Sequence, residues 1–220
     1  MIRVILPNPP AHYIADVKTP GESFIRAIPN PKAHEWEGKD FWRFIHDDLY
    51  AGLKGICVYC SSWSPRIKSD LYSEHHTSID HFIPKSRSPI QAYAWKNYRL
   101  CRTRLNRRKG VHQDVLDPCN INDGTFRIEF TTFLIEPLKT LPLPIQDRIR
   151  QTIERFELNK DRDYVNERIR VIQTYTLDQV SLDQLRQKYP FIAQQIVSQD
   201  FDVNYKSKLR DIFKSRNFRI

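Results

Sequence analysis

Apolar residues recur at helical spacing through the last hundred residues of the chain. Two stripes have the three- and four-residue steps of a helix face, namely Ile145, Ile149, Ile153 and Phe156, and then Val165, Ile169 and Ile172. Ser181 with Gln184 has the pattern of a capping box and predicts the start of a third helix, and Pro190 predicts the start of a fourth. The pattern predicts a mainly helical region whose stripes either form a core or dock a partner.

Prolines set the character of the N-terminal part. Six of the 14 prolines lie within residues 1–35, which disfavours long helices and central strands there. We therefore expect this segment to wrap the surface of something else. Helical spacing begins at Asp40 and continues to Leu53, and Gly55 is a plausible stop for that helix.

The middle of the chain predicts a strand, a loop, a second strand and a helix. A short strand is expected around Thr77–Phe82, broken by Pro84, and a short helix is expected after Ser88 and Pro89. An extended stretch at 98–101 leads into a helix over about 102–109, which Gly110 should end. A half-buried strand is predicted at 125–130. The fold class is therefore α+β, with an N-terminal wrap and lead-in helix (1–56), a core (57–120) and a strand plus helical C-terminal region (121–220).

Length and composition exclude several classes of protein. The chain has 220 residues, of which 40% are hydrophobic, so there is ample material for a core. No apolar stretch approaches the roughly 20 residues that span a bilayer, and the opening apolar run is cut short by Pro7. We expect a cytoplasmic protein without membrane contact. Four cysteines are too few for a disulfide scaffold, so reduced, structural or metal-bound thiols are favoured.

Positive charge is concentrated in the middle of the chain. The net charge is +9, and residues 57–120 alone hold 11 basic against 5 acidic side chains. No acidic residue interrupts the stretch from 99 to 109, whose basic residues are Arg99, Arg102, Arg104, Arg107, Arg108 and Lys109. A solvated helix face normally mixes both signs of charge, so this run favours nucleic-acid binding over that simpler reading.

Three motifs follow one another in the same segment. They are Cys57-Val-Tyr-Cys60, then Asp80-His81-Phe-Ile-Pro84-Lys-Ser86, then Asn97 followed nine residues later by Asn106-Arg-Arg-Lys109-Gly110. Together they resemble the HNH endonuclease family, whose active site is a ββα-metal motif. The resemblance covers about residues 57–118 and depends on the order and spacing of the parts, since an isolated Asp-His pair would carry no information.

The resemblance implies a role for each matched residue. His81 would be the general base that activates water, and Asn97 would support it by bracing the loop and orienting the imidazole. Asp80 and Asn106 would be the ligands of Mg²⁺ or Mn²⁺, which accept few protein oxygens and keep several waters. Lys109, one helical turn beyond Asn106, could meet a phosphate. Consecutive side chains on a strand point to opposite faces, so Asp80 and His81 can serve one phosphate only if the strand twists or ends there.

The cysteines depart from the family pattern. Many HNH proteins hold a structural Zn²⁺ with two Cys-x-x-Cys pairs, whereas here Leu105 stands in the place of one of those cysteines. A zinc site could be built from Cys57, Cys60, Cys101 and Cys119, and buried thiols are the alternative. His75 and His76 match no family position and are interpreted as surface histidines.

The prediction is therefore a metal-dependent endonuclease that hydrolyses phosphodiester bonds of double-stranded DNA. Asp117-Pro118 and the strand after it are similar to extensions of HNH effectors in bacterial anti-phage defence, including Septu-type nucleases that act with an ATPase subunit. One such site cuts one strand, so a homodimer or a partner would be needed for a double-strand break. The alternatives are a non-catalytic nucleic-acid-binding module and an interaction subunit of a larger ATPase-containing complex.

Overall fold

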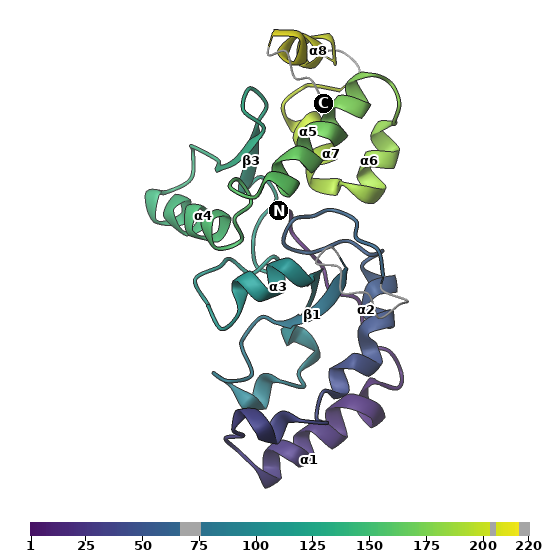
Figure 1. Ribbon diagram of the computed structural model, residues 1–220, viewed down its shortest axis with the longest axis vertical. Coiled ribbons are helices and arrows are strands. Elements are labelled where there is room, and N and C mark those ends of the chain that lie inside the picture. Colours follow the sequence, from purple (N-terminus) through teal and green to yellow (C-terminus); the bar gives the residue numbers. More distant parts are fainter. Residues whose placement is uncertain (67–75, 203–205, 216–220) are drawn as a thin grey trace. The chain divides into compact units, whose positions relative to one another are not determined.

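The described residues form helices and two small antiparallel sheets of two strands each, which confirms the α+β class (Figure 1). The computed structural model describes residues 1–66, 76–202 and 206–215. The helices are α1 (Thr19–Ala27), α2 (His46–Gly52), α3 (Thr103–Lys109), α4 (Leu143–Arg155), α5 (Arg162–Thr176), α6 (Leu182–Lys188), α7 (Pro190–Ser198) and α8 (Lys206–Ser215). The strands are β1 (Thr77–His81), β2 (Tyr98–Arg102), β3 (Phe126–Glu129) and β4 (Leu134–Pro137).

The chain divides into two compact units. The N-terminal unit comprises Val4–Tyr59 and Trp63–Gln113, and the C-terminal unit comprises Met1–Arg3, Cys60–Ser62 and Asp114–Ile220. The segments predicted as a separate wrap and a core therefore fall largely into one unit, because the N-terminal residues share its hydrophobic core.

The middle segment folds in the predicted order of strand, strand and helix. β1 pairs antiparallel with β2, with Asp80 opposite Arg99 and His81 opposite Tyr98. α3 follows β2 directly and packs against both strands (Figure 1). Gly110 ends α3 with a positive φ of 49°, a region that glycine enters without the clash of a Cβ.

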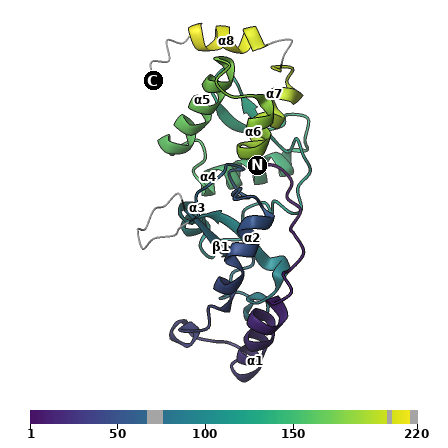
Figure 2. The same ribbon diagram turned by 90° about the vertical axis from the view of Figure 1, so that its right-hand side faces the viewer.

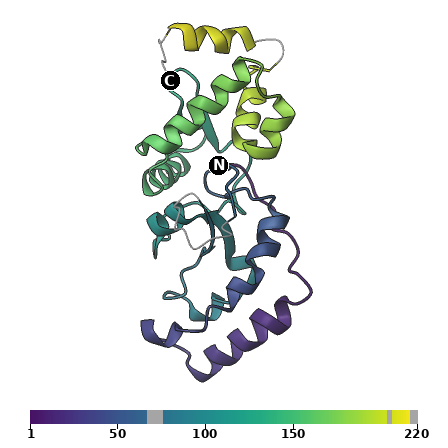
Figure 3. The same cartoon turned by 45° about the vertical axis from the view of Figure 1, so that its right-hand side comes forward.

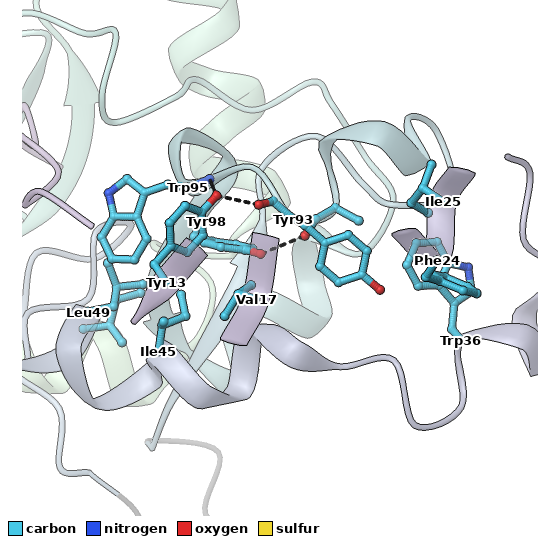
Figure 4. Packing of buried hydrophobic residues seen from close by; sticks show 12 residues of the cluster. Tyr13, Val17, Phe24, Ile25, Trp36, Ile45, Leu49, Tyr93, Trp95 and Tyr98 are labelled. Carbon is cyan, nitrogen blue, oxygen red and sulfur yellow. Dashed lines mark hydrogen bonds between the residues drawn. The ribbon is translucent and has the colours of Figure 1, made fainter. Parts of the chain in front are cut away.

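Aromatic side chains dominate the core of the N-terminal unit. Figure 4 shows Tyr13, Trp95 and Tyr98 together, with the Tyr13 hydroxyl donating to the backbone oxygen of Tyr93 at 2.6 Å and accepting from the Trp95 N–H at 2.9 Å. α2 packs beside the hairpin β1–β2 (Figure 2). A buried hydroxyl costs free energy unless it is paired, so these bonds allow tyrosine in the core.

The proline-rich segment contains more helix than its composition led us to expect. A π-helical turn at Ile14–Lys18 runs into α1, so residues 14–27 are continuously helical. Pro20 lies in the first turn of α1, directly after this π-helical turn. The predicted helix over residues 40–53 is instead a 3₁₀ turn, Phe41–Ile45, followed by α2.

Amide side chains bond the backbone at the edges of the C-terminal hairpin. Gln195 of α7 accepts from the Ile128 N–H of β3 and donates to the Phe126 oxygen. Asn159 does the same for β4, bonding both the N–H and the oxygen of Ile135. An exposed strand edge presents unpaired backbone groups, and these amides satisfy part of them.

The two helix starts predicted for the C-terminal region are correct. The capping box is complete, because Ser181 accepts from the Gln184 N–H while the Gln184 side chain accepts from the Ser181 N–H. α7 starts at Pro190 as predicted and packs against α6 (Figure 3). The stripes of α4 and α5 are largely buried, although Ile145 remains 42% exposed. β4 and α8 were not predicted. In the described ranges, no helix is long and apolar enough to cross a membrane.

Candidate functional site

Asp80 and His81 lie at the end of β1 and point to opposite sides of the strand. The Asp80 carboxylate lies with Lys109 of α3, whereas the His81 imidazole packs edge-on against Trp42 and Tyr98, at centroid separations of 4.6 and 5.4 Å. This is the alternation that a regular strand imposes. The two groups are adjacent along the chain, yet they face different surroundings.

The Asp80 carboxylate is buried and doubly hydrogen-bonded. Tyr59 donates to its Oδ2 at 2.5 Å, and the Lys109 ammonium donates to its Oδ1 at 2.9 Å. Burial raises the pKa of Asp80 above its usual value, and the Lys109 charge and the Tyr59 hydroxyl oppose that shift. Burial also raises the pKa of Tyr59 well above its usual value. The phenol therefore stays protonated and serves as a donor.

Asn106 projects from α3 toward β1. Its Nδ2 donates to the Ser78 Oγ at 3.1 Å and to the backbone oxygen of Ile79 at 3.2 Å. Ser78 and Asp80 share one face of the strand, so Asn106 and Asp80 approach the hairpin from the same side. Within the described ranges, the Asn106 Oδ1 accepts no hydrogen bond, which leaves an oxygen for a ligand.

The imidazole of His81 is held in one tautomer. Its Nε2 lies 2.8 Å from the backbone oxygen of Ala92, which can only accept, so Nε2 carries the proton and Nδ1 carries the lone pair. Burial lowers the pKa of His81 to about 4, and the positive charges of Lys85 and Lys109 act in the same direction. The ring is therefore neutral at neutral pH, as a proton acceptor must be.

Asn97 braces the loop between the two strands. Its Oδ1 accepts from the Ile83 N–H at 2.7 Å, and its Nδ2 donates to the backbone oxygens of Ile83 and Gln91, both at 2.9 Å. Gln91 precedes Ala92, whose oxygen holds the imidazole. These bonds tie the loop together, and the role of Asn97 in supporting the histidine stays a prediction.

The six basic residues of the predicted nucleic-acid surface separate into two groups. Arg99, Arg102 and Lys109 are buried and donate to partners within the chain: Arg99 to the oxygens of Lys96 and Tyr98, and Arg102 to the Ser64 Oγ and the Trp63 oxygen. The expected phosphate contact of Lys109 is therefore not available in this conformation, since its ammonium lies inside the protein. Arg104, Arg107 and Arg108 are at least partly exposed on α3.

The four cysteines of the predicted zinc site are divided between the two units. Cys57 and Cys101 belong to the N-terminal unit, and the Cys57 Sγ accepts from the Arg102 N–H at 3.3 Å. Cys60 and Cys119 belong to the C-terminal unit. In the part of the chain that the structure describes, no three His, Cys, Asp or Glu side chains are arranged to hold a metal ion. A structural zinc site finds no support there.

The two histidines that precede the motif, His75 and His76, were interpreted as surface residues. His76 is half-buried, and its buried Nδ1 has no hydrogen-bond partner among the residues that the structure describes, so His76 is less exposed than the predicted surface histidine. The matching prediction for His75 lies outside the described residues.

Among the described residues, Asp80 and Asn106 are the candidate oxygen ligands for a magnesium ion. Mg²⁺ is commonly held by one or two protein oxygens with water and phosphate completing the shell, so a pair of ligands is enough. Asn106 has an open oxygen, and each Asp80 oxygen retains a lone pair beyond its one hydrogen bond. The donor set therefore fits the ion, but the carboxylate already has a positive partner.

Several residues at the site carry no signal in the sequence. Tyr59 reaches Asp80 from 21 positions away, and Trp42 reaches His81 from the segment before α2. Lys85 lies over the rings of Trp36 and Trp42, with its Nζ 4.6 and 4.8 Å from their centroids. Tyr59 lies within the Cys57-Cys60 motif in the sequence, but nothing in that motif indicates a hydrogen bond to a carboxylate.

Comparison with known proteins does not identify a family. The sequence matches no protein-family model, and a search of curated proteins finds no significant relative. The HNH resemblance therefore stays a prediction based on the motifs and on the arrangement of β1, β2 and α3.

Proposed function

We propose that the chain is a metal-dependent HNH endonuclease that hydrolyses phosphodiester bonds of double-stranded DNA. The observation that carries the proposal is the ββα arrangement itself. β1 ends in Asp80 and His81, β2 returns antiparallel beside it, and α3 brings Asn106 to within 3.2 Å of the Ile79 oxygen, one residue from Asp80. The Asn106 side chain thus contacts the strand that carries Asp80, although Asn106 and Asp80 are 26 positions apart in the sequence.

His81 is the proposed general base. Because its Nε2–H is committed to the Ala92 oxygen, the proton of the attacking water passes to Nδ1. Asn97 keeps the loop, and with it the Ala92 oxygen, in place. Since the imidazole and the Asp80 carboxylate point to opposite sides of β1, the scissile phosphate would lie beyond the end of the strand, where both are within reach.

Asp80 and Asn106 would hold Mg²⁺ or Mn²⁺. A divalent cation bound there supplies charge stabilisation for the phosphate as negative charge develops in the transition state. Arg104, Arg107 and Arg108 of α3 would contact the DNA backbone, which positions a duplex without reading its sequence. A role in antiviral defence, with a partner ATPase or as a homodimer, is part of the proposal only through the resemblance.

Plasmid nicking tests the proposal. Purified protein is incubated with supercoiled plasmid in Mg²⁺, Mn²⁺ or EDTA, and conversion to the open circular form is followed. We expect nicking in either metal and none in EDTA. His81→Ala should reduce the rate by at least about 100-fold, as expected for loss of a general base, while DNA affinity changes little. His34→Ala, at an exposed histidine, is the matched control and should nick normally. Equal rates in the His81 variant and the wild type would refute the assignment.

A second candidate is a non-catalytic nucleic-acid-binding module. The observation in its favour is that Asp80 already has a cationic partner in Lys109, so that the pair can serve stability alone. This function predicts DNA binding without nicking in any metal, and the same assay separates the two.

A further inference from the structure

Lys109 is the most deeply buried charged group at the site. Its side chain is 0% exposed, and its Nζ donates to the Asp80 Oδ1 at 2.9 Å and to the His81 backbone oxygen at 2.8 Å. Lysine is almost never fully buried without a partner, because an unpaired ammonium loses its hydration. The position of Lys109 therefore depends on the negative charge of Asp80.

Asp80 depends on Lys109 in the same way. Its side chain is 3% exposed, and its other oxygen accepts from the neutral hydroxyl of Tyr59. Arg99, opposite Asp80 in the strand register, adds a second positive charge that favours the ionised carboxylate. The charge of Asp80 is thus fully compensated by groups of the protein itself.

A divalent cation on Asp80 would meet this ammonium at close range. An ion bound to a carboxylate oxygen lies about 2 Å from it, and the Lys109 Nζ lies 2.9 Å from one of those oxygens. Two positive groups at such separations in a poorly hydrated site repel each other strongly. The cation must therefore either displace the ammonium or bind against its charge.

We propose that Lys109 is the resident counter-ion of Asp80 and regulates the site by competing with the divalent metal ion. The inference rests on the proposed function, since it concerns the same two ligands. It explains how the protein holds its carboxylate in place without metal. Competition by Lys109 also couples metal binding to DNA binding, because a phosphodiester brings negative charge that the Lys109 ammonium and the metal ion can share. DNA should therefore increase the affinity for the metal ion, and the metal ion should increase the affinity for DNA by the same factor.

The competition is measured by titrating the protein with Mn²⁺ and monitoring the free ion by electron paramagnetic resonance, which gives the dissociation constant of the bound ion. Lys109→Met should bind Mn²⁺ at least about tenfold more tightly than the wild type, because the repulsion is gone. Tyr59→Phe is the matched control, since it removes the other donor to Asp80 without changing the charge, and it should alter the affinity much less. The double variant Asp80→Asn/Lys109→Met should lose the gain. Equal or weaker Mn²⁺ binding by a folded Lys109→Met variant would overturn the proposal.

Measurements on the wild type keep the proposal testable if Lys109→Met does not fold. A buried, hydrogen-bonded ammonium exchanges its protons slowly, so the Lys109 side chain should give an observable ¹H–¹⁵N signal in nuclear magnetic resonance. Adding Mg²⁺ should shift or remove that signal. A signal unchanged at saturating Mg²⁺, with binding that Asp80→Asn abolishes, would contradict the competition.

The two proposals can fail separately. If the wild type nicks plasmid with Mn²⁺ but Lys109→Met leaves the Mn²⁺ affinity unchanged, only the counter-ion role of Lys109 is refuted. If the wild type does not nick DNA in any metal, the nuclease proposal is refuted. The Mn²⁺ titration still reports whether Lys109 competes with the metal ion at Asp80.

Discussion

Replacing Asn97 with alanine should be costly for the N-terminal unit. The side chain is 4% exposed and makes three hydrogen bonds, two to Ile83 and one to Gln91. A buried group left without its partner costs about 1–3 kcal/mol, and the two released carbonyls are in partly exposed residues that water can reach. Counting one full penalty for the Ile83 N–H and partial penalties for the carbonyls, we expect a loss of about 3 kcal/mol.

The same substitution should disturb the imidazole of His81. Without Asn97, the loop that carries the Ala92 oxygen loses its tether at Gln91, so the acceptor of the His81 Nε2–H moves. The slowly exchanging Nε2 proton of His81 should then weaken or disappear in nuclear magnetic resonance spectra. A loss of stability without this change would mean that Asn97 braces the loop but does not orient the histidine.

Tryptophan fluorescence during urea unfolding measures the stability of the unit in question, because all four tryptophans lie in the N-terminal unit. Asn30→Ala is the matched control: Asn30 is exposed and lies in the same unit, so its replacement should change the free energy of unfolding by less than about 0.5 kcal/mol. If Asn97→Ala loses no more than this control, the reasoning about the brace is refuted.

Two further predictions concern packing and pH. In Gly21→Ala the new Cβ would lie 2.1 Å from the Tyr93 ring, so α1 must shift, and the free energy of unfolding in the same urea assay should fall by at least about 2 kcal/mol. Ser23→Ala, on the exposed face of α1, is the control and should be nearly neutral. A neutral Gly21→Ala would show that α1 does not pack against Tyr93. The pKa of His81 is about 4 in the folded protein and near 6.5 in the unfolded chain, so the unfolded chain takes up the proton first as the pH falls. In EDTA, the free energy of unfolding should therefore fall by about 3 kcal/mol between pH 6.5 and pH 4. A stability difference between wild type and His81→Gln that does not change over this range would contradict the pKa shift.

Much of the local structure was predictable because its signals lie within a few residues of each other. Gly110 after α3, the Ser181–Gln184 capping box and Pro190 at the start of α7 each act on neighbouring backbone groups. Errors arose where distant contacts outweigh local preference. The helical run over residues 14–27 is held by packing in the aromatic core, where Val17 is fully buried, and a proline count does not register that burial.

The sequence by itself determined the order of strands and helix around Asp80, His81 and Asn106, since each element is specified by short-range spacing. Only the tertiary structure decided where the charges went. Arg107 and Lys109 are equivalent in a count of charge, yet one is exposed and the other is buried against Asp80. The physical reason is that burial depends on which remote segments cover a side chain. Tyr59 and Asp80 are 21 positions apart, and their hydrogen bond exists only after the segment around Tyr59 has packed against β1. Lys109 likewise reaches Asp80 only after α3 has packed against β1.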